Sequence, residues 1–586
     1  MKHRLDALRA RLEAAGVDGF LVPRSDEHLG EYVPPSGERL AWISGFTGSA
    51  GMAVVLRDRA VLFTDGRYTT QAAAQTDPAL WERRHLTEEP PAEWLKAQAP
   101  NARIGYDPWL HSEGGLKPFV EAGITLVPLP ENPLDAIWTD RPELPSAPLR
   151  AHGVEFAGEA AEAKRARLAH DLGADAALLA DSHSVAWLLN LRGGDLAHTP
   201  MALAFALLRD DASAGLFLHA PQRVGAALRA HLGNGVSVAD RVTLPEALHR
   251  LAGKRVRVDA DATPARLLDL LREAGAELVP GDDPCRLPRA CKNEVEQEGA
   301  RVAQRKDAVA LSRFLAWMAR EAPKGGLTEM AAAAQLLDFR RDVPGFAGES
   351  FPAISGAGEN GAIVHYRATP ETDRVIRPDE CYLIDSGGQY PEGTTDVTRT
   401  LWTGPGPAPE ELRARYTAVL RGHIALATLC FPEGVAGPHI DAIARRPIWD
   451  LGLDFDHGTG HGIGAFLSVH EGPVSISRAA KPIPVRPGMI LSDEPGFYLP
   501  GAYGIRIENL LLAREAPRRP DQRKNFLEFE TLTLAPYARA LIVPSMLTEA
   551  ERDWVDAYQA RVLREVGPAL DEADRAWLEE ECTKLG

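Results

Sequence analysis

The chain has 586 residues, of which 45% are apolar and 25% charged, a composition typical of globular proteins too long for a single hydrophobic core. Its net charge of −17, from 65 Lys and Arg against 82 Asp and Glu, argues against nucleic acid and anionic membranes as partners, because both require basic patches. The longest apolar stretches, such as 201–208, are far shorter than the ~20 residues that cross a bilayer, so we expect no membrane span.

The cysteines are an odd number without Cys-x-x-Cys spacing: Cys285, Cys291, Cys381, Cys430 and Cys582. This usage argues against a disulfide framework and fits a reducing compartment. The first residues, Met-Lys-His-Arg-Leu-Asp-Ala-Leu, lack the apolar stretch of a signal peptide. We therefore expect a cytoplasmic protein.

The beginning of the chain predicts an α/β domain. Leucines three or four residues apart form one face of an opening helix, which Gly16 ends. Apolar strands are expected at 20–22, 52–56 and 60–63. Prolines gather between Pro128 and Pro148, so we predict a first domain at 1–148.

A second α/β domain is predicted at 149–290. It starts with a helical pattern near Glu159 and an apolar strand at 176–180, and its sequence weakly repeats that of the first domain. Domain duplication is therefore a hypothesis. Further prolines, Pro280, Pro284 and Pro288, indicate the boundary that ends this domain.

A third domain is predicted at 291–586. It opens with a long amphipathic helix over 293–320. Its last part, from Leu547, has the pattern of helices, and we expect the apolar face of these helices to cover a partner surface. The residues typical of metal sites all follow the long helix.

Two aspartates lie on neighbouring predicted strands. Asp385 ends an apolar strand, and Asp396 lies on a second strand whose alternation places it on one face with Thr398 and Thr400. Because the turn signal Pro-Glu-Gly separates them, a hairpin is expected to bring the two carboxylates together. A strand-end Asp and a polar surface strand are the structural alternatives.

The motif HGTGHG contains two histidines four residues apart. Its repeated glycines argue against a helix, and on a strand His457 and His461 would share a face. His470 follows in VHEGP. His365, on an apolar strand expected at 362–366, is interpreted equally well as a core histidine.

Two glutamates complete the set. Glu494 precedes Pro495, which favours an extended conformation at the head of a Pro-Gly turn. Farther along, alternation places Arg506 and Glu508 on one face, so we expect the guanidinium beside this last carboxylate, where it orients ligands. A surface Arg-Glu pair is the alternative.

Taken together, four carboxylates and one imidazole predict a site for two divalent cations and hence a hydrolase. The order Asp, Asp, His, Glu, Glu, with the motifs HGTGH, VHEGP, SDEPG and GIRIEN, resembles the pita-bread metallopeptidase family. Within it, the stretches DSGGQY to GTTDVTRT and WDLGLDFDHGTGHG are similar to those of the long, three-domain cytosolic Xaa-Pro aminopeptidases.

The resemblance covers the whole chain and implies a fold of two creatinase-like α/β domains followed by a pita-bread catalytic domain, commonly dimeric. It assigns two metal ions, most often Mn²⁺ with Co²⁺ or Zn²⁺ as alternatives, to five ligands: Asp385, Asp396, His461, Glu494 and Glu508. The substrates it implies are peptides with proline in second position.

The same resemblance implies roles in catalysis. Glu494 is expected to take the proton of the nucleophile, and His470 or His365 to stabilise the developing oxyanion. His457 is expected to help line the proline pocket. Proline makes the scissile bond a tertiary amide, so a dedicated pocket is needed.

Competing interpretations remain. A prolidase would cut only Xaa-Pro dipeptides, and the two N-terminal domains favour the peptide-cleaving type. Creatinase would not need the preserved ligands, and methionine aminopeptidase is disfavoured by the long N-terminal part. A scaffold without catalysis would have lost ligands, and all five are present.

Overall fold

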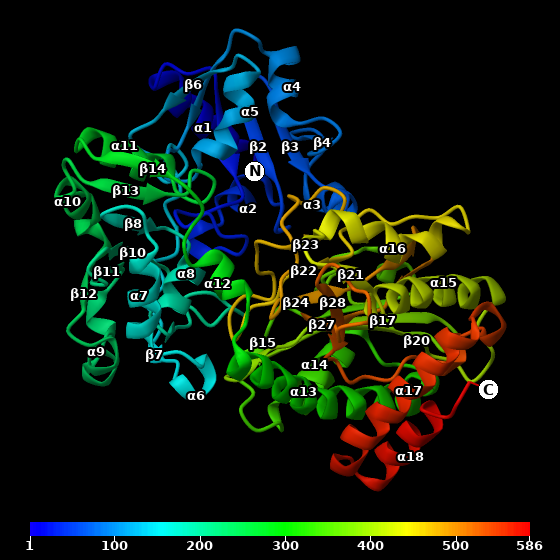
Figure 1. Cartoon of the computed structure of the whole chain (residues 1–586). Helices are drawn as coiled ribbons and strands as arrows, with labels where there is room; N and C mark the ends of the chain where they lie inside the picture. Colours follow the sequence, from blue (N-terminus) through cyan, green and yellow to red (C-terminus); the bar gives the residue numbers. More distant parts are fainter. Residues whose placement is uncertain (586) are drawn as a thin grey trace. The chain divides into compact units, whose positions relative to one another are not determined.

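The computed structural model describes residues 1–585, which form two compact units (Figure 1). The first unit comprises Met1–Val154 and Glu159–Arg286, and the second comprises Glu155–Gly158 and the chain from Leu287 onward. Within residues 1–585, no helix is both long enough and apolar enough to cross a membrane.

The first unit contains two six-stranded sheets of identical topology. One has the order β4-β3-β2-β1-β5-β6, and the other has the order β12-β11-β10-β8-β13-β14. In both sheets, the second and third pairs of neighbouring strands in this order are antiparallel, and the other three pairs are parallel. The duplication predicted from the sequence is thus confirmed at the level of topology.

The strands of the first sheet are β1 (Gly19–Pro23), β2 (Met52–Leu56), β3 (Ala60–Thr64), β4 (Glu82–His85), β5 (Arg103–Tyr106) and β6 (Thr125–Pro128). Those of the second are β8 (Ala176–Leu179), β10 (Ala204–Arg209), β11 (Ala214–Leu218), β12 (Val236–Asp240), β13 (Arg255–Val258) and β14 (Glu277–Pro280). The predicted opening helix is α1 (Lys2–Ala14), with its leucines buried as expected.

The long helix predicted over 293–320 is α13 (Glu294–Glu321) of the second unit. Asn293 caps it through a reciprocal pair of hydrogen bonds with Glu296, a strong helix start. The helices α14 (Glu329–Arg341), α15 (Glu410–Ala427) and α16 (Gly437–Trp449) follow. Figure 1 shows α15 and α16 on one side of the strands of this unit and α13 and α14 on the other.

The strands of the second unit form small antiparallel sheets. One joins β16 (Ile354–Ala357), β17 (Cys381–Ser386) and β20 (Val397–Trp402), and another joins β21 (Cys430–Pro432), β28 (Phe526–Thr531), β27 (Asn509–Glu515) and β24 (Ile490–Asp493). Two short pairs complete the scaffold of the site: β22 (Gly460–His461) with β23 (Ser475–Ile476), and β25 (Gly496–Leu499) with β26 (Tyr503–Arg506).

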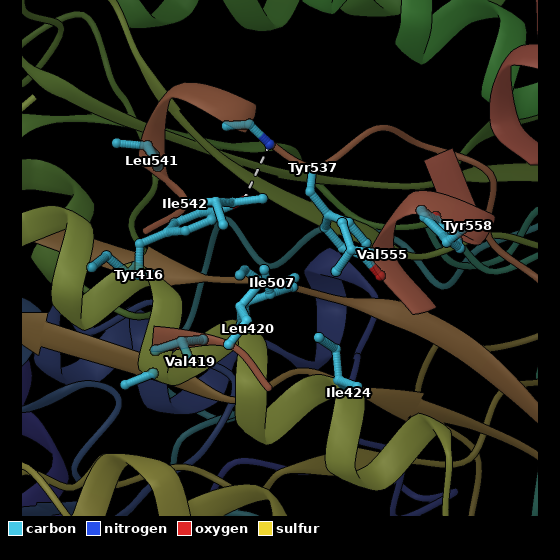
Figure 2. Packing of buried hydrophobic residues seen from close by; sticks show 14 of the residues in the cluster. Tyr416, Val419, Leu420, Ile424, Ile507, Tyr537, Leu541, Ile542, Val555 and Tyr558 are labelled. Atoms are coloured by element: carbon cyan, nitrogen blue, oxygen red, sulfur yellow. Dashed lines mark hydrogen bonds between the residues drawn. The ribbon is translucent and has the colours of Figure 1, made fainter. Parts of the chain in front are cut away.

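The C-terminal helices α17 (Glu549–Val566) and α18 (Glu572–Glu581) confirm the helical prediction. Their apolar face, however, lies in the core of their own chain. Figure 2 shows Val555 and Tyr558 of α17 with Tyr537 opposite the α15 residues Leu420 and Ile424. Trp554 and Trp577 pack against this core but are only partly buried, so the expectation that the tail also covers a partner surface stays a prediction.

Candidate metal centre

The two aspartates lie on the hairpin that the sequence predicts. Strands β17 and β20 pair antiparallel, with Asp385 opposite Thr398. Asp396 directly precedes β20, which starts at Val397, so the prediction that it lies on the strand is wrong by one residue, but it is only two residues from the position facing Asp385. Both carboxylates are buried, at 7% and 4% exposure. The antiparallel register thus brings two acids separated by a loop into one site.

His461 is held with a defined ring orientation. Its backbone N–H donates to Ser492 Oγ at 2.9 Å, and its Nδ1 lies 3.0 Å from the Gly462 carbonyl oxygen. Because a carbonyl only accepts, Nδ1 carries the hydrogen and Nε2 is left with a lone pair. Nε2 faces Asp396 Oδ2 at 3.5 Å and Glu494 Oε1 at 3.4 Å.

The two glutamates reach the same site from the ends of different strands. Glu494 follows β24 directly, and Ser492 Oγ donates to its Oε1 at 3.1 Å. Glu508 lies between β26 and β27, and its Oε2 accepts from Thr398 Oγ1 at 2.7 Å. The predicted Pro-Gly turn is wrong, because the chain continues from Glu494 through Pro495 into strand β25.

The carboxyl groups of this site lie close to one another and are shielded from water. Burial raises the pKa of Asp396 and of Glu508 well above their usual values, and the charges of neighbouring carboxylates raise both further. Burial also raises the pKa of Glu494 to about 7, with Asp385 adding to the shift while Arg506 opposes it. Such repulsion is relieved by a bound cation.

The donor set fits divalent metal ions. One ligand atom each of Asp396, His461 and Glu508 lies within 4.8 Å of the other two. Among residues 1–585, Asp385 Oδ1 and Glu508 Oε1 are buried without a hydrogen-bond partner, so each has a free coordinating oxygen. Carboxylate oxygens with one imidazole nitrogen are typical ligands of metals such as manganese, cobalt or zinc.

Arg506 lies in the site but beside a different acid from the one expected. Its Nη2 donates to Asp385 Oδ2 at 2.6 Å, and its Nε contacts Thr398 Oγ1 at 3.3 Å. It reaches Glu508 only through Thr398. The shared partner Thr398 Oγ1 agrees with the predicted common face of Arg506 and Glu508, but the carboxylate that the guanidinium binds directly is that of Asp385.

His457 is close to the site through a tyrosine. Its Nε2 lies 2.8 Å from Tyr498 Oη, and Arg506 Nη1 donates to that same oxygen at 2.6 Å. Because the strand is confined to Gly460–His461, the prediction that His457 shares its face is wrong, and His457 lies in the preceding bend. The absence of a helix over the glycine-rich motif is confirmed.

His470 and His365 lie on separate segments. The His470 ring packs edge-on against His461, with centroids 4.2 Å apart, and its charge lowers the pKa of Glu494 against the larger effect of burial. His365 lies in a turn after the short 3₁₀ helix Gly358–Ala362, so the strand predicted at 362–366 is wrong. The adjacent Val364 carbonyl accepts from Arg506 at 3.3 Å.

Sequence reasoning missed Tyr498 and Ser492. Tyr498 is four residues after Glu494 on extended chain, an even spacing that places both side chains on one face, so parity was an available signal. Burial raises the pKa of Tyr498 to about 12, which keeps its phenol protonated and able to donate to His457. The same parity was available for Ser492, which lies on β24 two residues before Glu494.

Comparisons with known proteins agree along the whole chain. The description "Metallopeptidase family M24" matches residues 298–515, "C-terminal region of peptidase_M24" matches 525–585, and "Creatinase/Prolidase N-terminal domain" matches both 4–133 and 140–296.

Two relatives are named probable Xaa-Pro aminopeptidase P. That of Neosartorya fischeri is 39% identical over 99% of this chain and 92% of its own length, and that of Laccaria bicolor is 38% identical over 99% and 93%. The solved X-prolyl aminopeptidase of Caenorhabditis elegans, described as a cytosolic enzyme with a di-nuclear active site, is 32% identical. It superposes with a TM-score of 0.94 and covers 100% of this chain and 99% of its own.

Proposed function

Because the chain belongs to metallopeptidase family M24, with two creatinase-like α/β domains before a pita-bread catalytic domain, we propose that it is an Xaa-Pro aminopeptidase. It releases the first residue from peptides that have proline in second position. The observation that supports this most strongly is the full-length similarity to an X-prolyl aminopeptidase, combined with a largely buried cluster of carboxylates and one imidazole in which all five ligand residues are present. The domain boundaries at 148 and 290 remain predictions.

Five residues would hold two divalent ions: Asp385, Asp396, His461, Glu494 and Glu508. When bound, the metals supply Lewis-acid chemistry that activates a water and polarises the scissile carbonyl. The protein aligns the ligands: Arg506 orients Asp385, Thr398 orients Glu508, and Ser492 orients Glu494. Manganese is our proposal for the metal, with cobalt and zinc as the alternatives.

The remaining polar groups have assignable tasks. Glu494, which is held by Ser492, is the proposed acceptor of the proton that the nucleophile loses. His470, edge-on to His461, or His365, which follows Val364 whose carbonyl accepts from Arg506, is proposed to stabilise negative charge on the scissile carbonyl oxygen. His457 is proposed to line the proline pocket, with its ring held by Tyr498.

The deciding experiment is hydrolysis of Arg-Pro-Pro by the full chain with and without chelator, then with added Mn²⁺, Co²⁺ or Zn²⁺. We expect chelator to abolish release of arginine and Mn²⁺ to restore it best. The Asp396→Asn variant should stay inactive with metal, whereas Asp342→Asn, which changes a carboxylate 65% exposed, should behave as wild type. Activity on Arg-Pro alone would indicate a prolidase instead.

Two further proposals concern the assembly and location of the protein. A homodimer is expected from the resemblance, and its mass in solution is measurable by sedimentation. A cytoplasmic location is supported by the description of the nematode structure as a cytosolic enzyme. Fractionation of cells that express the full chain tests that location.

A further inference from the structure

A histidine without a role in the proposed reaction lies behind the metal centre. His423 on α15 is completely buried, at 0% exposure. It contacts both strands β24 and β27, which pair antiparallel with Asp493 opposite Asn509. Each of these residues immediately precedes or follows a proposed metal ligand, Glu494 and Glu508 respectively.

One nitrogen of His423 binds the β24 side. Nδ1 lies 3.1 Å from the Asp493 carbonyl oxygen and 3.0 Å from Asp493 Oδ2. A carbonyl oxygen only accepts, so Nδ1 carries a hydrogen and donates it to Asp493. The imidazole therefore anchors the residue that directly precedes Glu494.

The other nitrogen binds the β27 side, and a guanidinium fixes the direction of the hydrogen bonds. Arg399 Nη2 donates to Asn509 Oδ1 at 2.8 Å, so the amide nitrogen of Asn509 must point the other way. This Nδ2 donates to Tyr537 Oη at 2.8 Å and faces His423 Nε2 at 3.1 Å. Tyr537 Oη lies 2.9 Å from His423 Nε2.

The Asn509 amide and the Tyr537 hydroxyl both present hydrogens to His423 Nε2. This nitrogen therefore accepts, and the ring is the neutral tautomer with its hydrogen on Nδ1. A one-way chain of donors thus runs from Arg399 through Asn509, Tyr537 and His423 to Asp493. Arg399 also donates from Nη1 to the Glu508 carbonyl oxygen at 2.7 Å. The chain therefore holds the backbone beside both glutamate ligands.

The surroundings show that packing alone does not require this polar chain. Apolar residues, among them Leu420 and Ile424 of the same helix, surround Tyr537 (Figure 2). Burying polar groups costs free energy, and an apolar core of the same shape would avoid that cost. A directional series of hydrogen bonds that joins the two ligand-bearing strands, from Asn509 to the Asp493 carbonyl oxygen, indicates a positioning function.

We propose that His423 is a positioning residue of the metal centre: by joining Asp493 to Asn509, it holds Glu494 and Glu508 at the separation that two metal ions require. This inference rests on the proposed two-metal function. Partners that orient metal ligands typically contribute 10- to 100-fold to metal affinity. No contact between His423 and substrate is involved.

The test is calorimetric titration of Mn²⁺ into the chelator-treated full chain, alongside thermal unfolding of the metal-free protein. We expect wild type to bind about two equivalents and His423→Leu to bind ~10- to 100-fold more weakly. His423→Asn, whose amide occupies the place of Nδ1 and can still donate to Asp493, should recover part of the affinity. If His423→Leu does not fold, the Mn²⁺ affinity of His423→Asn still tests the inference.

Ile424→Ala is the matched control, because Ile424 is the next residue of α15, is buried at 3% exposure and lies in the same core. It should lower the unfolding temperature without weakening Mn²⁺ binding. Unchanged affinity in both His423 variants, or an equal loss of affinity in Ile424→Ala, would overturn the inference while wild type still binds two ions. If wild type binds no Mn²⁺, the proposed function and this inference both fail.

Discussion

Arg506 Nη2 contacts Asp385 Oδ2 at 2.6 Å, although the two residues are 121 positions apart in the chain. The same guanidinium donates to Tyr498 Oη from Nη1. One planar cation therefore ties the first ligand of the centre to the tyrosine that holds His457. A lysine at this position, with a single nitrogen, could not make these contacts together.

Arg506→Lys should therefore lower kcat/KM for Arg-Pro-Pro by ~10- to 100-fold, because both Asp385 and Tyr498 lose a directional partner. Steady-state kinetics at saturating Mn²⁺ measure this. The control is Arg514→Lys, which changes a guanidinium 52% exposed and paired with Glu528. Equal losses in the two variants would contradict a specific role for Arg506.

Tyr498→Phe should reduce kcat/KM for Arg-Pro-Pro by ~10- to 150-fold, since a hydrogen bond to a charged group contributes ~1.5–3 kcal/mol. The hydroxyl that is removed accepts from Arg506 and donates to His457. Tyr503→Phe is the matched control: its hydroxyl accepts from Arg415 at 2.6 Å, outside the site. We expect kcat/KM of Tyr503→Phe to equal that of wild type, and a loss as large as that of Tyr498→Phe would count against the prediction.

Two glycines of the motif HGTGHG should respond differently to alanine. At Gly460 a Cβ would lie 1.9 Å from the Ser492 carbonyl oxygen, so β22 would have to move away from β24. We expect Gly460→Ala to lose about 1–3 kcal/mol of unfolding free energy and to bind Mn²⁺ weakly. At Gly458 the nearest atom is 3.3 Å away, on the Ser477 side chain, so Gly458→Ala should remain close to wild type. Denaturant unfolding and metal titration of both variants provide the measurement.

Glu494 should make the free energy of unfolding of the metal-free protein decrease as the pH rises. Its pKa is raised from 4.5 to about 7, so between these values the native state holds a proton that the unfolded state has released. The free energy of unfolding therefore falls across this window. We expect the unfolding temperature of wild type, relative to Glu494→Gln, to decrease from pH 4.5 to pH 7.

Burial lowers the pKa values of His28 and His111 to about 4, so these histidines make the free energy of unfolding rise with pH. Both variants share this contribution, so comparison with Glu494→Gln removes it. Bound metal should remove the decrease, because the cation replaces the proton as partner of the carboxylate. A difference between the variants that stays constant or grows with pH would contradict the assignment.

The sequence alone determined the features that depend on local patterns. The spacing of leucines in α1, the Asn293 cap of α13 and the apolar runs of β2 and β3 each specify an element through side chains that are close in the chain. The hairpin that pairs Asp385 with Thr398 follows from a turn between two such runs.

Only the tertiary structure decided which partner each polar side chain meets. Arg506 pairs with Asp385 and not with its near neighbour Glu508, and His423 reaches Asp493, 70 positions away, from a helix with no sequence signal of a site. These contacts depend on how strands and helices far apart in the chain are packed, and the period of a strand or helix carries no information about that packing. Parity along one strand predicts a shared face, but the choice of ion-pair and hydrogen-bond partners needs the assembled core.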